Sequence, residues 1–453
     1  MMTEGRGQGK SKRAVDTCPC TVSRGITDIM DSETTALSDL TGLRMLIVCV
    51  RDALHDRPLS VDTDEPLWPL LDRTACKQGV DAFLFPWLAA HFPEHFTTSS
   101  ALPDSVPGAW RMRALRELQR ATLRHRQLAE LAAGFERAGL DLVMLKGAWL
   151  AESVYANPAL RSMSDIDVLI RADQRDRSHA VMLQLGYTAT ADTLRNRFAC
   201  AQGYRHPQHL YTVEMHWDVF SKLEADSPEA DMAAIWWYVE PVRLYGSPCF
   251  ALSIPDQLAH LVHRMLHHLF AIPLRSYLDV ALLMRTRGDA LTPEAITAAG
   301  ARWQIGTAIP FVLRFTAELF DVPLPATLAK DVPYIDAFWR NAAIHALAYL
   351  PRGSERGAES TTLSYRQAGL FGRARLALSR IFMPRAFLAE RYPCARVLAG
   401  VPWAWVRRAR DLRRTHRATL IALDVDASLE QQWPNTAAVR AALANNLRKP
   451  KKS

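Results

Sequence analysis

The spacing of apolar residues changes twice along the chain, from helical to strand-like and back. Over residues 108–138 the apolar positions recur every three or four residues from Trp110 to Phe135, and the opposite face is rich in arginine. This period predicts one long amphipathic helix, and Gly139 stands where a helix commonly ends. We expect residues 37–138 to form an N-terminal helical arm.

Short apolar runs replace the helical period after this arm. The runs are LDLVMLK (140–146), DIDVLI (165–170) and HLYTVEMHWDVF (209–220). The first two are too short for helices and the third alternates, so all three are expected to be strands. Helical spacing returns after the first run and again over residues 172–186. We therefore predict an α+β core at residues 139–250, a small mixed sheet with flanking helices between N- and C-terminal helical regions.

The two ends of the chain differ from this core. Residues 1–36 lack any apolar period and are expected to be a disordered leader. From residue 251 onward the pattern is helical again, and Ser253 and Pro255 suit the N-cap and first turn of a helix. We expect residues 251–453 to be a C-terminal helical domain, which ends in a basic tail that includes Lys449–Lys452.

Composition narrows the class of protein. The chain has 453 residues, 49% of them hydrophobic, which is enough for a full core. Its seven cysteines are scattered without metal-ligand spacing, which is typical of reduced thiols in a cytoplasmic protein. The N-terminal residues lack the apolar core of a secretion signal, and no apolar run reaches the roughly 18 residues that a membrane span needs. We therefore expect neither export nor a membrane-spanning helix.

Positive charge is concentrated late in the chain. The formal net charge is +8, which suits an anionic substrate, a nucleic acid or an acidic membrane without separating them. Residues 398–417 combine Trp403 and Trp405 with six arginines, at positions 407, 408, 410, 413, 414 and 417. This segment predicts contact with an anionic membrane surface or a nucleic acid, the alternative being a packed helix with solvated arginines. No pattern indicates an oligomer.

Two aspartates share one face of the second predicted strand. Asp165 and Asp167 alternate with buried positions, so their carboxylates point the same way. Like charges this close repel unless a cation lies between them, and Mg²⁺ prefers such oxygen ligands. Glu214 on a separate strand is the candidate third acid, which would make a site for phosphoryl or nucleotidyl transfer. The alternative is a strand end with solvated acids. If repulsion between these two carboxylates dominates, Asp165→Asn or Asp167→Asn should leave the fold intact or slightly more stable.

A second motif, Lys146–Gly147, lies between the first strand and the helix that follows it. Backbone N–H groups at such a turn face an incoming anion, and a glycine allows a phosphate to approach the backbone. Arg161 and Ser164 precede the paired aspartates. We assign Lys146, Gly147, Arg161 and Ser164 to binding of the nucleotide phosphates.

These motifs occur together in the order LKGAWLAESVYANPALRSMSDIDVLI, VEMHWDV, LSIPDQLAHLVHRMLHH and YLDVALL. Over roughly residues 110–285 the chain resembles the uncharacterised bacterial nucleotidyltransferase family of the DNA polymerase β superfold. By that resemblance Asp165, Asp167 and Glu214 are metal ligands and catalytic residues, and Gly147 is the glycine of the first-strand turn. The usual glycine-serine turn of the superfold is glycine-alanine here, so no hydroxyl follows Gly147.

The resemblance implies transfer of a nucleoside monophosphate from an NTP, expected to be ATP, to an unidentified acceptor hydroxyl or phosphate on a small molecule, peptide or protein. The implied cofactor is Mg²⁺ or Mn²⁺. Secondary site candidates are His216, His260, His263 and Asp279. A different class stays open, a catalytically silent nucleotide-sensing or nucleic-acid-binding scaffold on the same fold.

Overall fold

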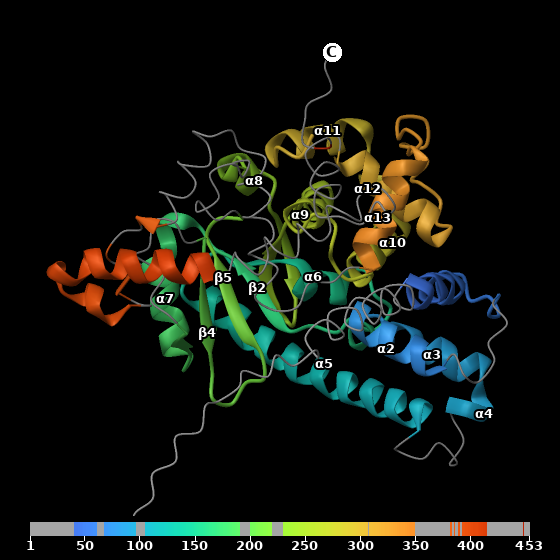
Figure 1. The fold of residues 1–453 in the computed structure, drawn as a ribbon, viewed down its shortest axis with the longest axis horizontal. Helices are drawn as coiled ribbons and strands as arrows, with labels where there is room; N and C mark the ends of the chain where they lie inside the picture. Colours follow the sequence, from blue (N-terminus) through green and yellow to red (C-terminus); the bar gives the residue numbers. More distant parts are fainter. Residues whose placement is uncertain are drawn as a thin grey trace, which may run out of the picture.

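A computed structural model shows a mixed α+β fold in which helices surround one sheet (Figure 1). It describes residues 40–60, 68–96, 105–190, 200–219, 230–306, 308–348, 381–382, 385, 388–389, 392–414 and 447. The predicted leader, residues 415–417 and the basic tail at 449–452 lie outside these residues. The α+β class predicted from the alternation of periods is confirmed.

The N-terminal part is helical, as the apolar period predicted. Residues 40–54 are helical and are followed by α2 (Trp68–Gln78), α3 (Asp81–His91), α4 (Pro93–Phe96) and α5 (Val106–Arg137). Helix α5 begins at Ser105, whose Oγ accepts a hydrogen bond from the backbone N–H of Gly108 at 3.1 Å. It ends just before Gly139, whose φ of +61° is a backbone conformation that favours glycine.

The sheet has seven strands in the order β3-β4-β5-β2-β1-β7-β6 within the described residues. Their bounds are β1 (Val143–Met144), β2 (Asp165–Leu169), β3 (Thr188–Ala189), β4 (Ala201–Arg205), β5 (Thr212–His216), β6 (Glu240–Leu244) and β7 (Ser247–Ala251). The β2–β5 and β1–β7 pairs are parallel, and the other pairs are antiparallel. The three predicted strands are confirmed as β1, β2 and β5 with shorter bounds, whereas the other four strands were not predicted.

Short helices connect the strands. They are α6 (Lys146–Ser153), η2 (Pro158–Leu160), η3 (Ala172–Gln174), α7 (Arg175–Gln184) and α8 (Met232–Trp237). One of them, α7, covers one face of the sheet. The Nδ1 of His179 on α7 lies 2.8 Å from the hydroxyl of Tyr204 on β4, and Tyr204 pairs with Val213 on β5. Because Val213 and Glu214 point to opposite faces, α7 covers the face away from Glu214.

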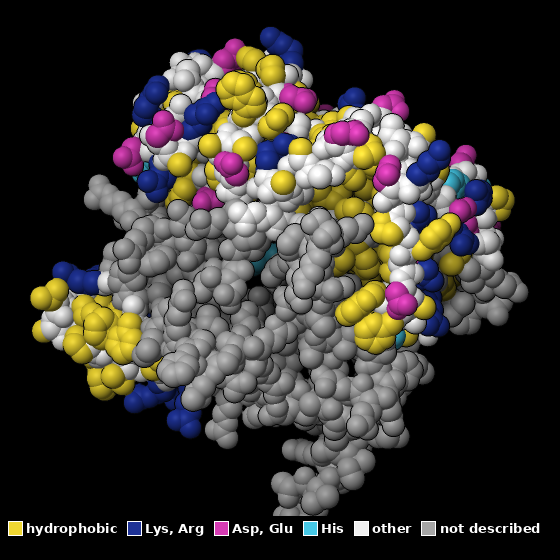
Figure 2. Space-filling model, turned by 90° about the horizontal axis from the view of Figure 1, so that it is seen from above, with side chains coloured by type: hydrophobic (Ala, Val, Ile, Leu, Met, Phe, Trp, Pro, Cys, Tyr) yellow, Lys and Arg dark blue, Asp and Glu magenta, His cyan; other side chains and the backbone are white. Residues whose placement is uncertain are grey.

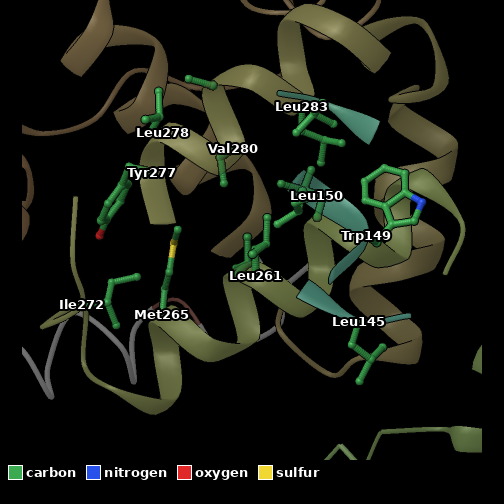
Figure 3. Close-up of a cluster of buried hydrophobic side chains, with 14 of the residues drawn as sticks. Leu145, Trp149, Leu150, Leu261, Met265, Ile272, Tyr277, Leu278, Val280 and Leu283 are labelled. Carbon is green, nitrogen blue, oxygen red and sulfur yellow. The ribbon is translucent and has the colours of Figure 1, made fainter. Parts of the chain in front are cut away.

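The C-terminal helices complete a continuous core with the sheet. They are α9 (Ile254–His267), α10 (Arg275–Arg287), η4 (Gly288–Ala290), α11 (Pro293–Arg302), α12 (Ala308–Phe320) and α13 (Ala337–Ala348). The predicted cap of α9 is confirmed, since the Oγ of Ser253 accepts a hydrogen bond from the N–H of Asp256. Figure 3 shows side chains of α6, α9 and α10 in one apolar cluster, with Leu150, Leu261 and Val280 among them.

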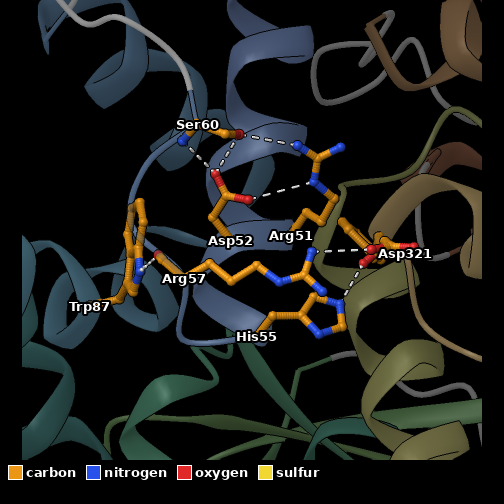
Figure 4. A network of polar contacts seen from close by, with 8 residues as sticks. Arg51, Asp52, His55, Arg57, Ser60, Trp87 and Asp321 are labelled. Atoms are coloured by element: carbon orange, nitrogen blue, oxygen red, sulfur yellow. Dashed lines mark hydrogen bonds and ion pairs between the residues drawn. The ribbon is translucent and has the colours of Figure 1, made fainter.

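Polar contacts join the N-terminal helices to the end of α12 (Figure 4). Arg57 donates to Asp321 at 3.2 Å, and the Nε2 of His55 lies 3.2 Å from the carbonyl oxygen of Phe320. The carboxylate of Asp52 accepts hydrogen bonds from both the N–H and the hydroxyl of Ser60, which holds the segment after the first helix. The N-terminal helices are therefore tied to the C-terminal helices as well as to the sheet.

Two further helical segments follow near the C-terminus. The short turns η5 (Pro393–Arg396) and η6 (Leu398–Gly400) lead into residues 401–414, which are helical. They lie at the left of the view in Figure 1, on the opposite side from α10 and α12. No helix among the described residues has both the length and the apolar character that crossing a membrane requires.

Candidate active site

The parallel pairing of β2 and β5 brings the predicted acids together. Asp167 pairs with Glu214, and Asp165 pairs with Thr212. Successive side chains of a strand point to opposite faces, so these four residues share one face while Ile166 is buried on the other. The sheet therefore presents three carboxylates from two adjacent strands on the face that α7 leaves uncovered. Thr212 belongs to this face too and was not predicted.

Asp167 is the centre of the polar contacts on this face. Its Oδ1 lies 3.0 Å from the Nζ of Lys146 and 3.0 Å from the Nε2 of His216. The same ring nitrogen of His216 lies 3.6 Å from the Oε2 of Glu214. Asp167, Glu214 and His216 each offer one ligand atom, and these atoms lie within 4.8 Å of one another. One small ion could contact all three residues.

The two carboxylates of this group differ in their affinity for protons. Burial alone would raise the pKa of Asp167, but the charge of Lys146 and the hydrogen bond from His216 outweigh it, and the pKa lies well below its usual range. The pKa of Glu214 is raised by burial and by the negative charge of Asp167, and His216 offsets only part of this. Asp167 is therefore held ionised, whereas Glu214 carries negative charge that its surroundings do not fully balance.

Asp165 lies beside this group and is not part of it. Its side chain is partly exposed, and its Oδ1 accepts a hydrogen bond from the Oγ of Ser164 at 2.8 Å. The sequence predicted Asp165, Asp167 and Glu214 as the metal ligands, whereas His216 takes the third place in the tight group. The charge of Asp165 still contributes to the raised pKa of Glu214, so it acts on the same site. The exposed Ser164 contacts Asp165 here, and its assignment to the nucleotide phosphates stays a prediction.

Lys146 reaches Asp167 from a strained turn. It is the first residue of α6 and has a φ of +44°, a region that non-glycine residues rarely occupy. The N–H of Leu145 donates to the carbonyl oxygen of Asp167 at 3.2 Å, which fixes the turn against β2. A strained residue at a polar cleft often has a functional role. The predicted strand, Lys-Gly turn and helix are confirmed.

Gly147 is required by a neighbouring side chain. A Cβ at this position would lie 2.2 Å from the Nη1 of Arg161 and 2.9 Å from the Sδ of Met163, which is closer than atoms can approach. The space that we predicted for a phosphate beside the glycine Cα is thus filled on this side by the guanidinium of Arg161. The absence of a side chain at Gly147 lets Arg161 pack beneath the turn.

The guanidinium of Arg161 is bound on its other side by Asp279 of α10. Its Nε donates to Oδ1 at 2.8 Å and its Nη2 donates to Oδ2 at 2.7 Å. The hydroxyl of Tyr155 donates to the same carboxylate at 2.7 Å. Burial would lower the pKa of Arg161, but Asp279 holds it above the usual range. This gives Arg161 and Asp279 a supporting role under the Lys146 turn, and a direct contact between Arg161 and a triphosphate stays a prediction.

Helix α9 borders the acidic face with two histidines. The ring of His260 is buried and stacks on Trp303 with the ring centroids 5.3 Å apart. Burial and the charge of Lys146 lower its pKa well below the usual value, so the ring is neutral and lies within electrostatic range of the site. His263 is also buried, with its ring 6.3 Å from that of Trp303.

A polar network that the sequence did not predict holds Trp303 in place. The indole N–H of Trp303 donates to Asp256 at 2.9 Å, and Arg302 donates to both oxygens of the same carboxylate. In the sequence, the only local sign of this network was the position of Asp256 in the first turn of α9. An acid is favoured there by the positive end of the helix dipole, so its presence does not by itself indicate a network.

Comparison with known proteins agrees with this geometry. A model of a family described as uncharacterised nucleotidyltransferase matches residues 64–321, more than half of the chain. The chain belongs to this nucleotidyltransferase family. The match begins just before α2 and ends just after α12, so it contains the whole sheet and both bordering helices α6 and α9. Neither the curated proteins nor the solved structures contain a match to the chain.

The acidic group formed by Asp167, Glu214 and His216 is suited to a divalent ion. Two carboxylates and one imidazole converge, and Asp165 can add a third carboxylate from the same strand face. Carboxylate oxygens are the ligands that Mg²⁺ and Mn²⁺ prefer. The raised pKa of Glu214 reports excess negative charge, which a cation at this point would offset.

Proposed function

We propose that the protein transfers a nucleoside monophosphate from an NTP, with ATP the first candidate, to an acceptor hydroxyl or phosphate in a reaction that depends on Mg²⁺ or Mn²⁺. The observation that carries this proposal is the meeting of Asp167 and Glu214 on two parallel strands, with Lys146 of α6 bound to Asp167. Membership in a nucleotidyltransferase family supports the reaction class. We place the reaction in the cytoplasm, where NTPs are abundant.

Asp167 and Glu214 are the residues that would hold the ion, with Asp165 beside them and His216 as a further ligand or as the group that orients Asp167. When bound, the ion would supply positive charge opposite the phosphates and the attacking oxygen. The low pKa of Asp167 keeps its carboxylate ionised, so it can remain a ligand over the physiological pH range.

Lys146 has a separate role at the edge of this group. Its ammonium is 3.0 Å from Asp167 and stands at the N-terminus of α6, where backbone N–H groups also favour an anion. It would bind the triphosphate and stabilise the negative charge that develops on the departing pyrophosphate.

Glu214 is the proposed base. In the transfer, the acceptor oxygen forms a bond to the α-phosphorus, the bond from that phosphorus to the bridging oxygen of pyrophosphate breaks, and the acceptor proton passes to Glu214. In the absence of the ion, burial and the charge of Asp167 raise the pKa of Glu214, so this carboxylate accepts a proton more readily than Asp167 does. Asp167 would thus act as a ligand alone, whereas Glu214 would both hold the ion and accept the proton.

The test is transfer of label from an α-³²P-labelled NTP, with pyrophosphate release measured in parallel. Each common NTP is offered with Mg²⁺ or Mn²⁺ to the full chain, together with sugars, aminoglycosides, peptides, proteins and tRNA as acceptors. We expect labelled acceptor from one class, and none from Glu214→Gln. If the protein binds a non-hydrolysable NTP but labels no acceptor and releases no pyrophosphate, the nucleotide-sensing scaffold replaces this proposal.

A further inference from the structure

The helical segment near the C-terminus has a small core of its own. Leu388, Tyr392, Ala395, Val401 and Ala404 are buried together, separately from the main core. The hydroxyl of Tyr392 donates to Asp411 at 2.8 Å, which ties the start of this segment to its last helix. Its inner face is therefore occupied, and the side chains on its outer face are not needed for packing.

Large apolar side chains lie on that outer face. Leu398 is 75% exposed and Trp403 is 51% exposed, and Val397 and Val406 are exposed beside them. Phe382 is exposed as well, and its ring lies edge-on to that of Trp405 at 5.1 Å. Figure 2 shows hydrophobic side chains gathered at the left of the molecule, with Lys and Arg side chains around them. We call this group of apolar and basic side chains the outer patch.

Arginines continue the outer patch along the helix of residues 401–414. Trp403, Val406, Arg407 and Arg410 are three, four and seven positions apart, so they lie on one face of the helix, and all four are exposed. Arg413 and Arg414 are exposed at its end. The helix thus presents apolar groups at its start and cations toward its end. Its one acidic residue, Asp411, is engaged by Tyr392.

We propose that the outer patch docks the protein on an anionic phospholipid membrane surface. The arginines match the charge of the lipid headgroups, and the apolar end can enter the boundary with the acyl chains. Tryptophan is enriched at that boundary. A nucleic acid fits less well: Trp403 and Phe382 offer rings for stacking, but the other exposed apolar side chains, Val397, Leu398 and Val406, are aliphatic and suit acyl chains rather than bases. This proposal does not depend on the transferase activity.

Flotation of the full chain with vesicles tests it. Vesicles of phosphatidylcholine alone are compared with vesicles that also contain phosphatidylglycerol, at low and at higher salt. We expect binding to the anionic vesicles, weakened by salt. Arg407→Glu/Arg410→Glu should lower the partition coefficient by about fivefold or more per arginine. Leu398→Ser/Trp403→Ser should lower it on the order of tenfold. Neither Leu398 nor Trp403 belongs to the small core, so this second variant keeps the fold.

The matched control is Arg287→Glu/Lys330→Glu, which makes the same charge change at exposed positions in the region of α10 and α12. It should bind vesicles almost as the parent does. The proposal is overturned if the parent does not float with anionic vesicles at low salt, or if the control weakens binding as much as the arginine variant. It is also overturned, in favour of a nucleic acid, if a single-stranded oligonucleotide binds at the same salt and Leu398→Ser/Trp403→Ser leaves vesicle binding unchanged.

Discussion

Asp167 and Asp279 are both buried carboxylates, yet their surroundings are built differently. Asp279 meets one guanidinium through two parallel hydrogen bonds and one hydroxyl, so a single negative charge is matched by a single positive charge. Asp167 directs one oxygen at both Lys146 and His216, and a second acid, Glu214, stands next to that histidine. The first arrangement is balanced and the second carries surplus negative charge.

This difference distinguishes a carboxylate that stabilises the fold from carboxylates that can bind a ligand. In the balanced pair, burial and the charge of Asp279 raise the pKa of Tyr155, and Asp279 outweighs burial to raise the pKa of Arg161, so both partners stay protonated. In the acidic group the pKa of Asp167 is lowered and that of Glu214 is raised. One further cation would balance the negative charge of both carboxylates. A buried acid with a complete set of partners is a structural element, whereas an incomplete set indicates a site for a ligand.

Replacing Glu214 should have the largest effect, and that effect is on activity. Glu214→Gln removes the proposed base and one ligand without changing the shape of the side chain, and we expect turnover to fall by about 10²- to 10⁴-fold. Nucleotide affinity, measured by calorimetry with a non-hydrolysable NTP, should be largely kept. Near-normal turnover would mean that another acid, with Asp218 the first to test, takes this role.

Breaking the balanced pair should cost stability. Arg161→Ala leaves Asp279 buried without its cation, and we expect the free energy of unfolding to drop by about 3–5 kcal/mol in urea denaturation. The control is Arg161→Met/Asp279→Leu combined with Tyr155→Phe, which removes both charges and the hydroxyl that Asp279 accepts from, and should recover most of the loss. A loss below about 1 kcal/mol for the single variant would show that solvent or another side chain replaces Arg161.

Neutralising the two aspartates of β2 should separate their roles. Repulsion alone predicts that Asn stabilises the fold at either position, but Asp167 is held ionised by Lys146 and His216. We therefore expect Asp167→Asn to destabilise the protein by about 2 kcal/mol, and Asp165→Asn to be neutral or slightly stabilising. Thermal melting gives the stability, and calorimetry with Mg²⁺ or Mn²⁺ should show weaker binding in both. Unchanged metal affinity in both variants contradicts the assigned ligands.

Replacing Lys146 in the strained turn should have a smaller effect on stability. Lys146→Gly and Lys146→Ala both remove the ammonium, but only glycine adopts a φ of +44° without strain. The glycine variant should be more stable than the alanine variant by about 1 kcal/mol in urea denaturation. Both should lose affinity for the triphosphate to the same extent. Equal stability would indicate that the turn relaxes when the lysine is removed.

The pH dependence of stability should show the smallest effect. The pKa of Glu214 is raised on folding, so the folded protein binds this proton more tightly than the unfolded chain does. Its contribution to stability is therefore lost as pH rises through the raised pKa. Without metal, Glu214→Gln should melt like the parent at acidic pH and slightly above it at neutral pH. Melting curves over this range check the sign, and a variant that melts lower at neutral pH contradicts it.

The sequence predicted the features that depend on the local spacing of apolar and polar residues. Helix α5, the strands β1, β2 and β5, and the shared face of Asp165 and Asp167 follow from spacing along the chain. The hairpin of β6 and β7 was missed because Pro241 and Pro248 interrupt its alternation, and proline normally argues against a strand.

Contacts between distant residues could not be predicted in this way. Arg161 and Asp279 are 118 positions apart, and no local pattern indicates that the guanidinium faces an aspartate of α10. His216 shares a strand face with Glu214, which the alternation showed, but its contact with Asp167 depends on the register between two strands. Register is set by the packing of the whole sheet rather than by either strand.

The parallel register of β2 and β5 also determines where the chain can change in length. Asp167 and His216 are 49 positions apart, yet backbone hydrogen bonds between neighbouring strands set their spacing directly. An insertion outside β2 and β5 leaves this ladder intact and the acids in place. Deleting one residue at the start of β5 would instead turn Glu214 toward the core and place an apolar side chain in the site. The segments around this strand pair can therefore change in length without moving the reacting groups, whereas the register within the pair cannot change.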